Sequence, residues 1–203
     1  MKKFRLFATL LVVALCATTV FTSCRNDDDD ENGGYFEIRA TNVSGNTSGV
    51  TTVRAEIFDD SEENFFTVGE APFQNNGFTL RLTNEIPASF LFPVAEVFPD
   101  NLVSDRSARI TFEVIPFAFV GNEIKGFWLV DHREYKHFWT LWFFADRSVT
   151  IRGDGGADYV NLNFKRGWNT VYVYSNNSTG EYRVTSQRPA GANLQWRFGD
   201  YGF

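Results

Sequence analysis

Residues 75–83, with the sequence NNGFTLRLT, decide the fold class of this chain. Asparagine and glycine accept the positive φ angles of tight turns, so the first three of these residues predict a turn. Phe78, Leu80 and Leu82 then alternate with polar residues, which is the period of a β-strand with one buried face. The stretch therefore predicts a tight turn that leads into a half-buried strand.

The same period of two recurs along the chain from residue 35 to its end. The further side chains that it predicts to point inward are Phe36, Ile38, Ala40, Val53, Ala55, Ile57, Val149, Ile151, Val160, Leu162, Phe164, Leu194, Trp196 and Phe198. No long segment has helical periodicity with capping residues. Roughly ten to twelve strands at a spacing of about 8 to 12 residues predict an antiparallel β-sandwich with Greek-key-type connections. The alternative is a calycin-like up-and-down β-barrel.

Two segments depart from this alternation. Residues 138–144 are apolar on both faces, with Phe138 and Trp142 on one face and Trp139 on the other, so we expect a central strand or one under a covering loop. Residues 86–105 contain three prolines among large apolar residues, and proline neither donates to a sheet nor continues a helix. We expect this segment to be a long crossover packed on the sheet, which favours the sandwich over the barrel.

Cysteine positions and charge exclude several classes of function. Cys16 and Cys24 are the only cysteines, so the remaining chain has no disulfide, thiolate metal site or cysteine nucleophile. Three of the 19 lysines and arginines lie within the first five residues, whereas all 25 acidic residues follow Cys24, so the formal charge from Cys24 onward is −9. Nucleic acid is therefore not an expected partner, because phosphate backbones are bound by clustered basic residues.

The first residues have the pattern of a secretory signal. A basic start is followed by an apolar stretch over residues 6–21. Residues 21–24, FTSC, resemble a bacterial lipobox, in which an apolar residue and two small ones precede a cysteine that is diacylated and becomes the mature N-terminus. The resemblance implies a signal peptide over residues 1–23 and lipid attachment at Cys24. Two or three acyl chains anchor a protein stably without spanning the membrane.

An acidic run follows the cysteine. Asp27–Glu31 resembles the export signal by which Bacteroidetes lipoproteins reach the outer face of the outer membrane. Five like charges also form a solvated, extended spacer, so residues 24–34 are expected to be a flexible tether. We expect residues 35–203 to form a single all-β domain that is displayed on the cell exterior; the alternative is the periplasmic face.

Four stretches of the body carry a wider resemblance. They are EAPFQNNGFTLRL (70–82), FADRSVTI (144–151), LNFKRGWNTVY (162–172) and LQWRF (194–198). Together they resemble a group of uncharacterised Bacteroidetes outer-membrane surface lipoproteins. The resemblance implies a β-rich outer-membrane lipoprotein and brings no activity, substrate or catalytic residue with it.

Catalytic motifs are absent from the sequence after the leader. It contains no Gly-x-Ser-x-Gly elbow, no phosphate-binding glycine loop and no dinucleotide-binding fingerprint. Paired carboxylates of the glycosidase kind leave no sequence trace, so residues such as Glu113, Glu134 and Asp146 remain candidates for convergence in space. We expect no enzymatic activity, and a glycoside hydrolase-like enzyme is the least favoured alternative.

A metal site has little support in the sequence. His132 and His137 are the only histidines, and Asp131 and Glu134 lie beside them. On one continuous strand His132 and Glu134 would share a face while His137 would point the opposite way. The pattern favours a polar hairpin over a metal site.

Two acidic stretches and one tripeptide are likewise interpreted as ordinary structural segments and not as binding sites. Asp154–Asp158 and Asp59–Glu63 lack the ligand spacing of a calcium loop. Arg152–Asp154 spells RGD, and we interpret it as ordinary turn residues, not as an integrin-binding loop. We expect no metal and no cofactor.

Tryptophans supply the strongest candidate for a binding site. Trp128, Trp139 and Trp142 are close in sequence, and exposed flat rings are suited to stacking on sugar faces. We therefore expect a non-catalytic binding module for a glycan or polypeptide outside the cell, with these three residues as its platform. The alternative is a structural or assembly subunit of an envelope complex that pairs through an edge strand.

Overall fold

The computed structural model of the protein describes residues 35–59, 63–154 and 158–200. The predicted leader, tether and lipid-attachment residue Cys24 lie outside these residues. The described strands are β1 (Phe36–Ala40), β2 (Thr52–Phe58), β3 (Phe65–Pro72), β4 (Phe78–Leu82), β5 (Phe92–Pro93), β6 (Leu102–Val103), β7 (Arg109–Ile110), β8 (Phe117–Val120), β9 (Glu123–His132), β10 (Lys136–Ala145), β11 (Val149–Asp154), β12 (Asp158–Phe164), β13 (Gly167–Asn176), β14 (Glu181–Thr185) and β15 (Gln195–Gly199). The helical elements are a 3₁₀ turn η1 (Ala88–Phe90) and a single turn α1 (Val94–Val97). The predicted all-β class is confirmed.

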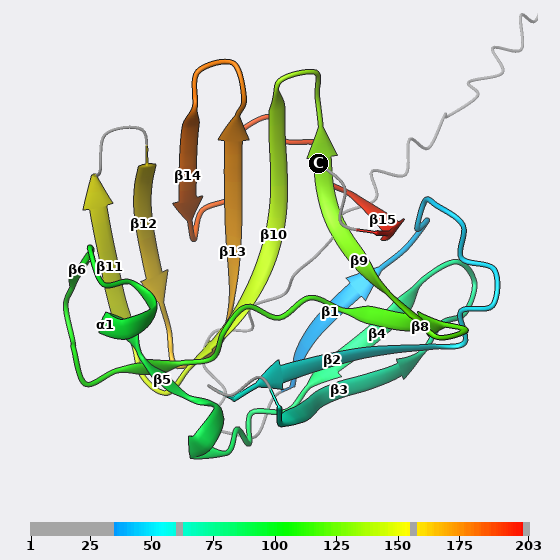
Figure 1. The fold of residues 1–203 in the computed structure, drawn as a ribbon, viewed down its shortest axis with the longest axis horizontal. Coiled ribbons are helices and arrows are strands. Elements are labelled where there is room, and N and C mark those ends of the chain that lie inside the picture. The colour runs from blue at the N-terminus through cyan, green and yellow to red at the C-terminus, as the bar shows by residue number, and fades with distance from the viewer. Residues whose placement is uncertain (1–34, 60–62, 155–157, 201–203) are drawn as a thin grey trace, which may run out of the picture.

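The strands pack in two layers (Figure 1). Strands β11, β12, β14, β13, β10 and β9 lie side by side in one layer, and the same hydrogen-bonded sheet continues through β8, β2 and β3 past a bend in β9. Strands β1 and β4 form a separate two-stranded sheet. The described strands form no closed barrel, and the arrangement agrees with the predicted sandwich.

One strand pair departs from the antiparallel prediction. Strands β12 and β14 run in parallel, with Val160 opposite Val184. Strands β13 and β14 form an antiparallel hairpin, and β14 lies between β12 and β13 in the sheet. Because the chain passes over one strand position after β12 and then turns back, β14 has the direction of β12. The expectation of a purely antiparallel fold was wrong at this pair.

The predicted turn at residues 75–77 is confirmed. Asn75 and Asn76 have φ angles of 51° and 57°, and Gln74 and Gly77 exchange backbone hydrogen bonds of 2.9 and 3.0 Å. Two central residues with positive φ are typical of a type I′ hairpin turn, whose twist matches that of the flanking strands. The turn therefore sets the direction in which β4 leaves.

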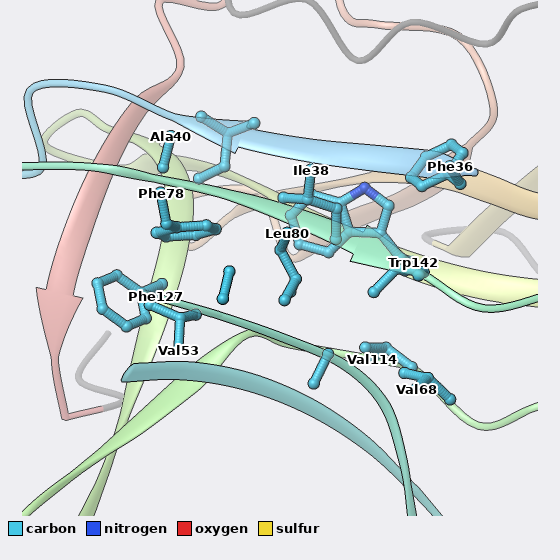
Figure 2. Packing of buried hydrophobic residues seen from close by; sticks show 14 of the residues in the cluster. Phe36, Ile38, Ala40, Val53, Val68, Phe78, Leu80, Val114, Phe127 and Trp142 are labelled. Atoms are coloured by element: carbon cyan, nitrogen blue, oxygen red, sulfur yellow. The ribbon is translucent and has the colours of Figure 1, made fainter. Parts of the chain in front are cut away.

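The inward-facing residues predicted by the alternation are also confirmed. Val160 is half-buried and all the others are buried. Strand β1 pairs with β4 in full register, with Ile38 opposite Leu80, and both side chains are fully buried. Figure 2 shows these two residues close to Phe78, Phe127 and Val53 in what we call the first core.

Strand β10 is the central strand that residues 138–144 predict. It pairs with β13 over ten residues and with β9 at its start. Phe138, Trp142 and Phe144 belong to the first core. Phe143 on the opposite face belongs to a second cluster of buried residues, which we call the second core, and Trp139 packs at its margin.

The proline-containing segment covers part of this second face. It contains η1, β5, α1 and β6, so it forms no single regular element, as expected. Val94 of α1 is fully buried in the second core with Ile110 of β7. In Figure 1, α1 and β5 lie at the lower parts of β11 and β12, and β6 lies beside the middle of β11. The crossover therefore covers the lower half of this face.

Three tryptophans connect the layers. Trp142 and Trp196 stack with ring centroids 5.9 Å apart and an angle of 6° between the planes. The Trp196 indole N–H donates to the carbonyl of Arg39 in β1 at 3.1 Å, and that of Trp168 donates to the carbonyl of Thr83, just after β4, at 2.8 Å. Burial of an indole N–H is favourable when the group has a partner, so these two bonds help to fix where the β1–β4 pair lies.

Replacement of Gly77 tests the close approach of the hairpin turn to β1. An added Cβ at Gly77 would meet the backbone carbonyl oxygen of Ala40 closer than 3.0 Å, and β1 cannot shift without losing its pairing with β4. We expect Gly77→Ala to lower the free energy of unfolding by about 3 kcal/mol, as measured by urea denaturation.

Gly121→Ala is the matched control. Gly121 has a φ of +62° and no atom within 4 Å of an added Cβ, so only the backbone conformation is penalised, at about 1 kcal/mol. Equal losses in the two variants would contradict the assignment of a steric conflict at Gly77.

Candidate functional site

The strand register gathers a set of side chains on the outer face of the sheet, opposite the first core. One row across the strands contains Gln195, Val130, Trp139, Val173, Val184 and Val160. The next row toward the hairpin ends contains His132, His137, Ser175 and Tyr182. We call the part of this surface that is made of Trp128, Val130, His132, His137, Trp139, Tyr182, Gln195 and Arg197 the tryptophan–histidine face.

This face lies at the end of the sheet that the crossover leaves open. In Figure 1 the hairpins β9–β10 and β13–β14 rise above the level of α1, β5 and β6. Tyr182 is 37% exposed, and His132 is also exposed. Trp139 is half-buried and contacts the second core only at its margin. The face is therefore accessible to solvent, and the ring of Trp139 packs on the margin of the second core beneath it.

Two of the three predicted platform tryptophans lie on this face. Trp139 packs near Tyr182, with ring centroids 6.1 Å apart and planes inclined by 54°. Trp128 is half-buried, its ring lies over Gly126, and its indole N–H donates to the carbonyl of Gly199 at 3.3 Å.

Trp142 lies on the opposite face of β10 and is fully buried. Figure 2 shows its ring among the residues of the first core. Its expected place in an exposed platform is therefore wrong: Trp142 is an odd number of residues from Trp139 on the same strand, so the two rings point to opposite faces.

A polar hollow borders the face at β15. It has a volume of about 530 Å³, and its lining residues are Ser44, Gly45, Val130, Asp131, His132, Asn193, Gln195 and Arg197. Ser44 pairs with Arg197 outside the regular strands, through backbone bonds to Trp196 and Phe198. Gly45 has a φ of +105°, and an added Cβ would overlap the Phe198 carbonyl. The close passage of residues 44–45 over β15 thus requires glycine and forms one wall of the hollow.

Asp131 shapes the opposite wall. Its carboxylate accepts hydrogen bonds from the Arg133 guanidinium at 2.7 and 3.3 Å and from the backbone N–H of Asn193 at 2.7 Å. Burial raises the pKa of Asp131, but the hydrogen bonds from Arg133 and Asn193 outweigh it and hold the pKa below its ordinary value of 3.8. Arg133 also donates to the carbonyl of Gly191. This carboxylate therefore fixes the segment that leads into β15.

The two histidines face each other across the β9–β10 hairpin. Their Nδ1 atoms are 3.1 Å apart, and the ring centroids are 5.3 Å apart. The expectation that His137 points away from His132 was wrong, because it treated the residues as one strand. The chain reverses at residues 133–135, and the register makes His132 and His137 direct cross-strand neighbours. The polar hairpin itself is confirmed.

The polar contacts of the pair match one arrangement of tautomers. The Asn177 amide nitrogen lies 3.3 Å from Nε2 of His137, and an amide NH₂ can only donate, so Nε2 accepts. In the tautomer that matches this contact, Nδ1–H of His137 donates to Nδ1 of His132. Burial, followed by the positive fields of His137 and Arg197, lowers the pKa of His132 below 6.5. The imidazole of His132 is therefore mostly neutral at pH 7.

The RGD tripeptide and two of the candidate carboxylates lie in or beside regular strands. Arg152 and Gly153 lie in strand β11, and the Arg152 guanidinium donates to the Leu162 carbonyl and the Asn163 side chain, so the expected turn at RGD was wrong. Glu134 precedes β10 and Asp146 follows it. A ten-residue strand is about 33 Å long, so these two carboxylates do not form a glycosidase pair.

The two acidic stretches, Asp59–Glu63 and Asp154–Asp158, are only partly described. Residues 60–62 and 155–157 lie outside the described residues. Asp59 accepts hydrogen bonds from the backbone and side chain of Asn64 across the β2–β3 connection. Its carboxylate therefore closes that turn.

Within residues 35–59, 63–154 and 158–200, no group of three or more histidine, cysteine or acidic side chains is arranged to hold a metal ion. None of the helices in the same ranges has the length and hydrophobicity that a membrane-spanning helix needs. Comparison with family models, with curated proteins and with solved structures gives no match.

Substitution of Asp131 tests its role at the hollow. We expect Asp131→Asn to lower the free energy of unfolding at pH 7 by about 1–2 kcal/mol, because the variant loses the charged partner of Arg133. The folded-state pKa is depressed, so the stabilisation by Asp131 is complete above pH 3.8 and is lost as the pH falls through the folded-state pKa. Urea denaturation at pH 7 and at about pH 2.5 should therefore show the difference between wild type and variant shrinking.

Asp200→Asn serves as the control, because that side chain is 80% exposed and lies 3.9 Å from its lysine partner. It should change stability by less than about 0.5 kcal/mol at either pH. A deficit in Asp131→Asn that stays constant between the two pH values would contradict the assigned ionisation.

Proposed function

We propose that this protein is a non-catalytic, lipid-anchored binding protein of the outer-membrane surface, and that it binds glycans on the tryptophan–histidine face. The observation that carries the proposal is the partly exposed ring of Trp139 beside a polar hollow. The lipid anchor on Cys24 and the exterior location rest on the sequence resemblance. Membrane attachment through acyl chains and an extracellular glycan are thus the two partners that we propose.

The chemistry of a sugar ring matches this surface in two ways. One face of many pyranose rings presents C–H groups, which pack on an indole, while hydroxyl groups around the rim require donors and acceptors. Trp139 is held by Val130 and Val173 on either side and by Tyr182. A ring that is already fixed loses little conformational entropy when a ligand binds.

The polar hollow supplies the second requirement. Its lining includes the side chains of Asn193, Gln195 and Arg197, and these amide and guanidinium groups donate and accept hydrogen bonds in planar arrangements. Gln195 and Trp139 flank Val130 in the same row of the sheet. A saccharide lying along this row reaches the ring and the polar groups together. A purely apolar ligand would leave these polar groups without partners, at a cost in affinity.

The position of β1 supports the proposed display. The described body begins at Tyr35, just before β1. In Figure 1, β1 lies in the lower layer, whereas the hairpins that carry His132, His137 and Tyr182 lie at the upper end of the sheet. Strand β1 therefore lies on the first-core side of the sheet, opposite the tryptophan–histidine face, which supports access of extracellular ligands to this face.

Binding to a glycan array tests the proposed ligand. We expect the chain from residue 25 onward to bind at least one glycan class, and Trp139→Ala to weaken that binding about tenfold or more, because a stacking contact of about 1.4 kcal/mol is lost. Affinities are measured by isothermal titration calorimetry with the glycan that the array selects.

Phe119→Ala is the matched control, since Phe119 is 48% exposed on β8 and lies outside the face. It should leave the affinity unchanged. The glycan proposal is refuted if no glycan binds, or if Trp139→Ala binds as tightly as wild type. Binding of polypeptides in place of glycans would also count against it.

Mass spectrometry of the protein purified from membranes tests the anchor. We expect residues 1–23 to be absent and Cys24 to carry the mass of a diacylglyceryl group. Cys24→Ser should lack this mass and should no longer partition with membranes, because the variant has no cysteine to carry the diacylglyceryl group. A non-lipidated protein that begins elsewhere would overturn the anchor, whereas the glycan measurement is independent of it.

Protease accessibility on intact cells tests the proposed surface display. External protease should degrade the protein on intact cells, and replacement of the acidic residues Asp27–Glu31 with serine should protect it, because the proposed export signal is removed. Cys24 and its lipid are retained in that variant. Full protection of the wild-type protein on intact cells would place the body on the periplasmic side.

A further inference from the structure

We propose that His132 and His137 together bind one divalent late first-row transition-metal ion, and that Cu²⁺ is held more tightly than Ni²⁺ or Zn²⁺. The proposal is independent of the glycan ligand. It rests on the cross-strand geometry of the two imidazoles.

The separation of the two nitrogens fits a shared ion. Metal–nitrogen bonds to imidazole are about 2.0–2.1 Å long. Two such bonds to Nδ1 atoms that are 3.1 Å apart enclose an angle of about 100° at the metal. This angle lies between the 90° of a tetragonal Cu²⁺ site and the 109° of a tetrahedral Zn²⁺ site. The hairpin thus presets two neighbouring corners of a coordination polyhedron.

The backbone holds this separation. His132 and His137 are paired residues in the antiparallel β9–β10 hairpin, and the next pairs, Asp131 with Phe138 and Val130 with Trp139, continue the same register. The carboxylate of Asp131 binds Arg133 and Asn193 and so fixes the end of β9. The backbone therefore needs little reorganisation to hold the two donors at this separation, which favours binding.

Asn177 provides the outer contact that a coordinating imidazole needs. Metal-bound histidine usually donates its other ring N–H to an oxygen acceptor, which orients the ring. When the metal replaces the hydrogen bond between the Nδ1 atoms, the proton of His137 moves from Nδ1 to Nε2. The Asn177 side chain lies 3.3 Å from Nε2, and a turn of its amide group presents the oxygen to this proton.

The open positions and the surrounding charges define the kind of site. His132 is exposed, and two imidazoles leave the other coordination positions to water. Asp131 attracts a cation at His132, whereas Arg197 repels it. The balance predicts a weaker site than a closed structural one. For two imidazole ligands the affinity order follows the Irving–Williams series, which places Cu²⁺ first.

Metal titration of the intact protein tests the proposal. The full chain is purified in mild detergent with an affinity tag that contains no histidine, treated with a chelator, and titrated separately with CuCl₂, NiCl₂ and ZnCl₂. We expect one Cu²⁺ per chain by calorimetry, with weaker binding of the other two ions. The electron paramagnetic resonance spectrum of the Cu²⁺ complex should show splitting from two imidazole nitrogens.

Variants of the pair locate the ion. His132→Gln and His137→Gln should each weaken Cu²⁺ binding at least tenfold, because one of two protein ligands is lost. Lys136→Gln, which alters an exposed neighbour on the same hairpin, should leave the affinity within twofold of wild type. Circular dichroism confirms that each variant is folded, and the wild-type spectrum decides the question if a histidine variant is not.

Three results would overturn the site. They are the absence of Cu²⁺ binding, an unchanged affinity in both histidine variants, and a resonance spectrum without two imidazole nitrogens. Loss of glycan binding in Trp139→Ala with retained Cu²⁺ binding would show that the two sites are separate.

Discussion

The structure depends on a single strand that is buried on both faces. β10 pairs with β13 along its full length of ten residues, and its two faces belong to different cores. A half-buried strand can be covered by one layer, but β10 requires two. The β1–β4 pair covers the inner face, and the proline-containing crossover covers half of the outer face. Each large ring that β10 buries stabilises the fold by about 2–3 kcal/mol, so both covers are coupled to the same strand.

The fold class can be predicted from residue periodicity, because a strand that buries one face has apolar residues at alternate positions. Phe78, Leu80 and Leu82 are buried as their alternation predicts, and the preceding asparagines adopt the positive φ that their residue type allows. The parallel pairing of β12 with β14 produces no such pattern in the sequence. It arises from the order in which hairpins join the sheet, and side-chain periodicity is the same in parallel and antiparallel strands when one face is exposed.

The candidate site was predictable only in part, for the same reason. Period two places Trp139 and Trp142 on opposite faces of β10, but both faces are apolar, so the sequence does not tell which face is fully covered. The tight stack of Trp142 on Trp196 joins residues 54 positions apart and depends on where β15 pairs. Three polar atoms on the inner face, Thr140 Oγ1, Trp142 Nε1 and Thr170 Oγ1, have no hydrogen-bond partner among the described residues. Such burial is costly, and sequence polarity alone places Thr140 and Thr170 on an exposed face.

The contact between the two histidines was not predicted, because the turn between them contains no glycine or proline to mark it in the sequence. Residues 133–135 carry no strong turn residue, yet the β9–β10 hairpin places His132 opposite His137. Counting residues across the reversal as one strand gives the wrong face, whereas counting back from Trp139 and Val130 gives the observed pair.

The proline-containing crossover does not reach the row of His132 and His137, because its apolar residues are buried in the second core. The upper ends of the strands then keep an open surface that contains aromatic, imidazole and guanidinium groups on a rigid sheet. Sites on rigid strands hold their geometry better than sites on loops, so the feature that leaves β10 partly uncovered also fixes the groups available to a ligand.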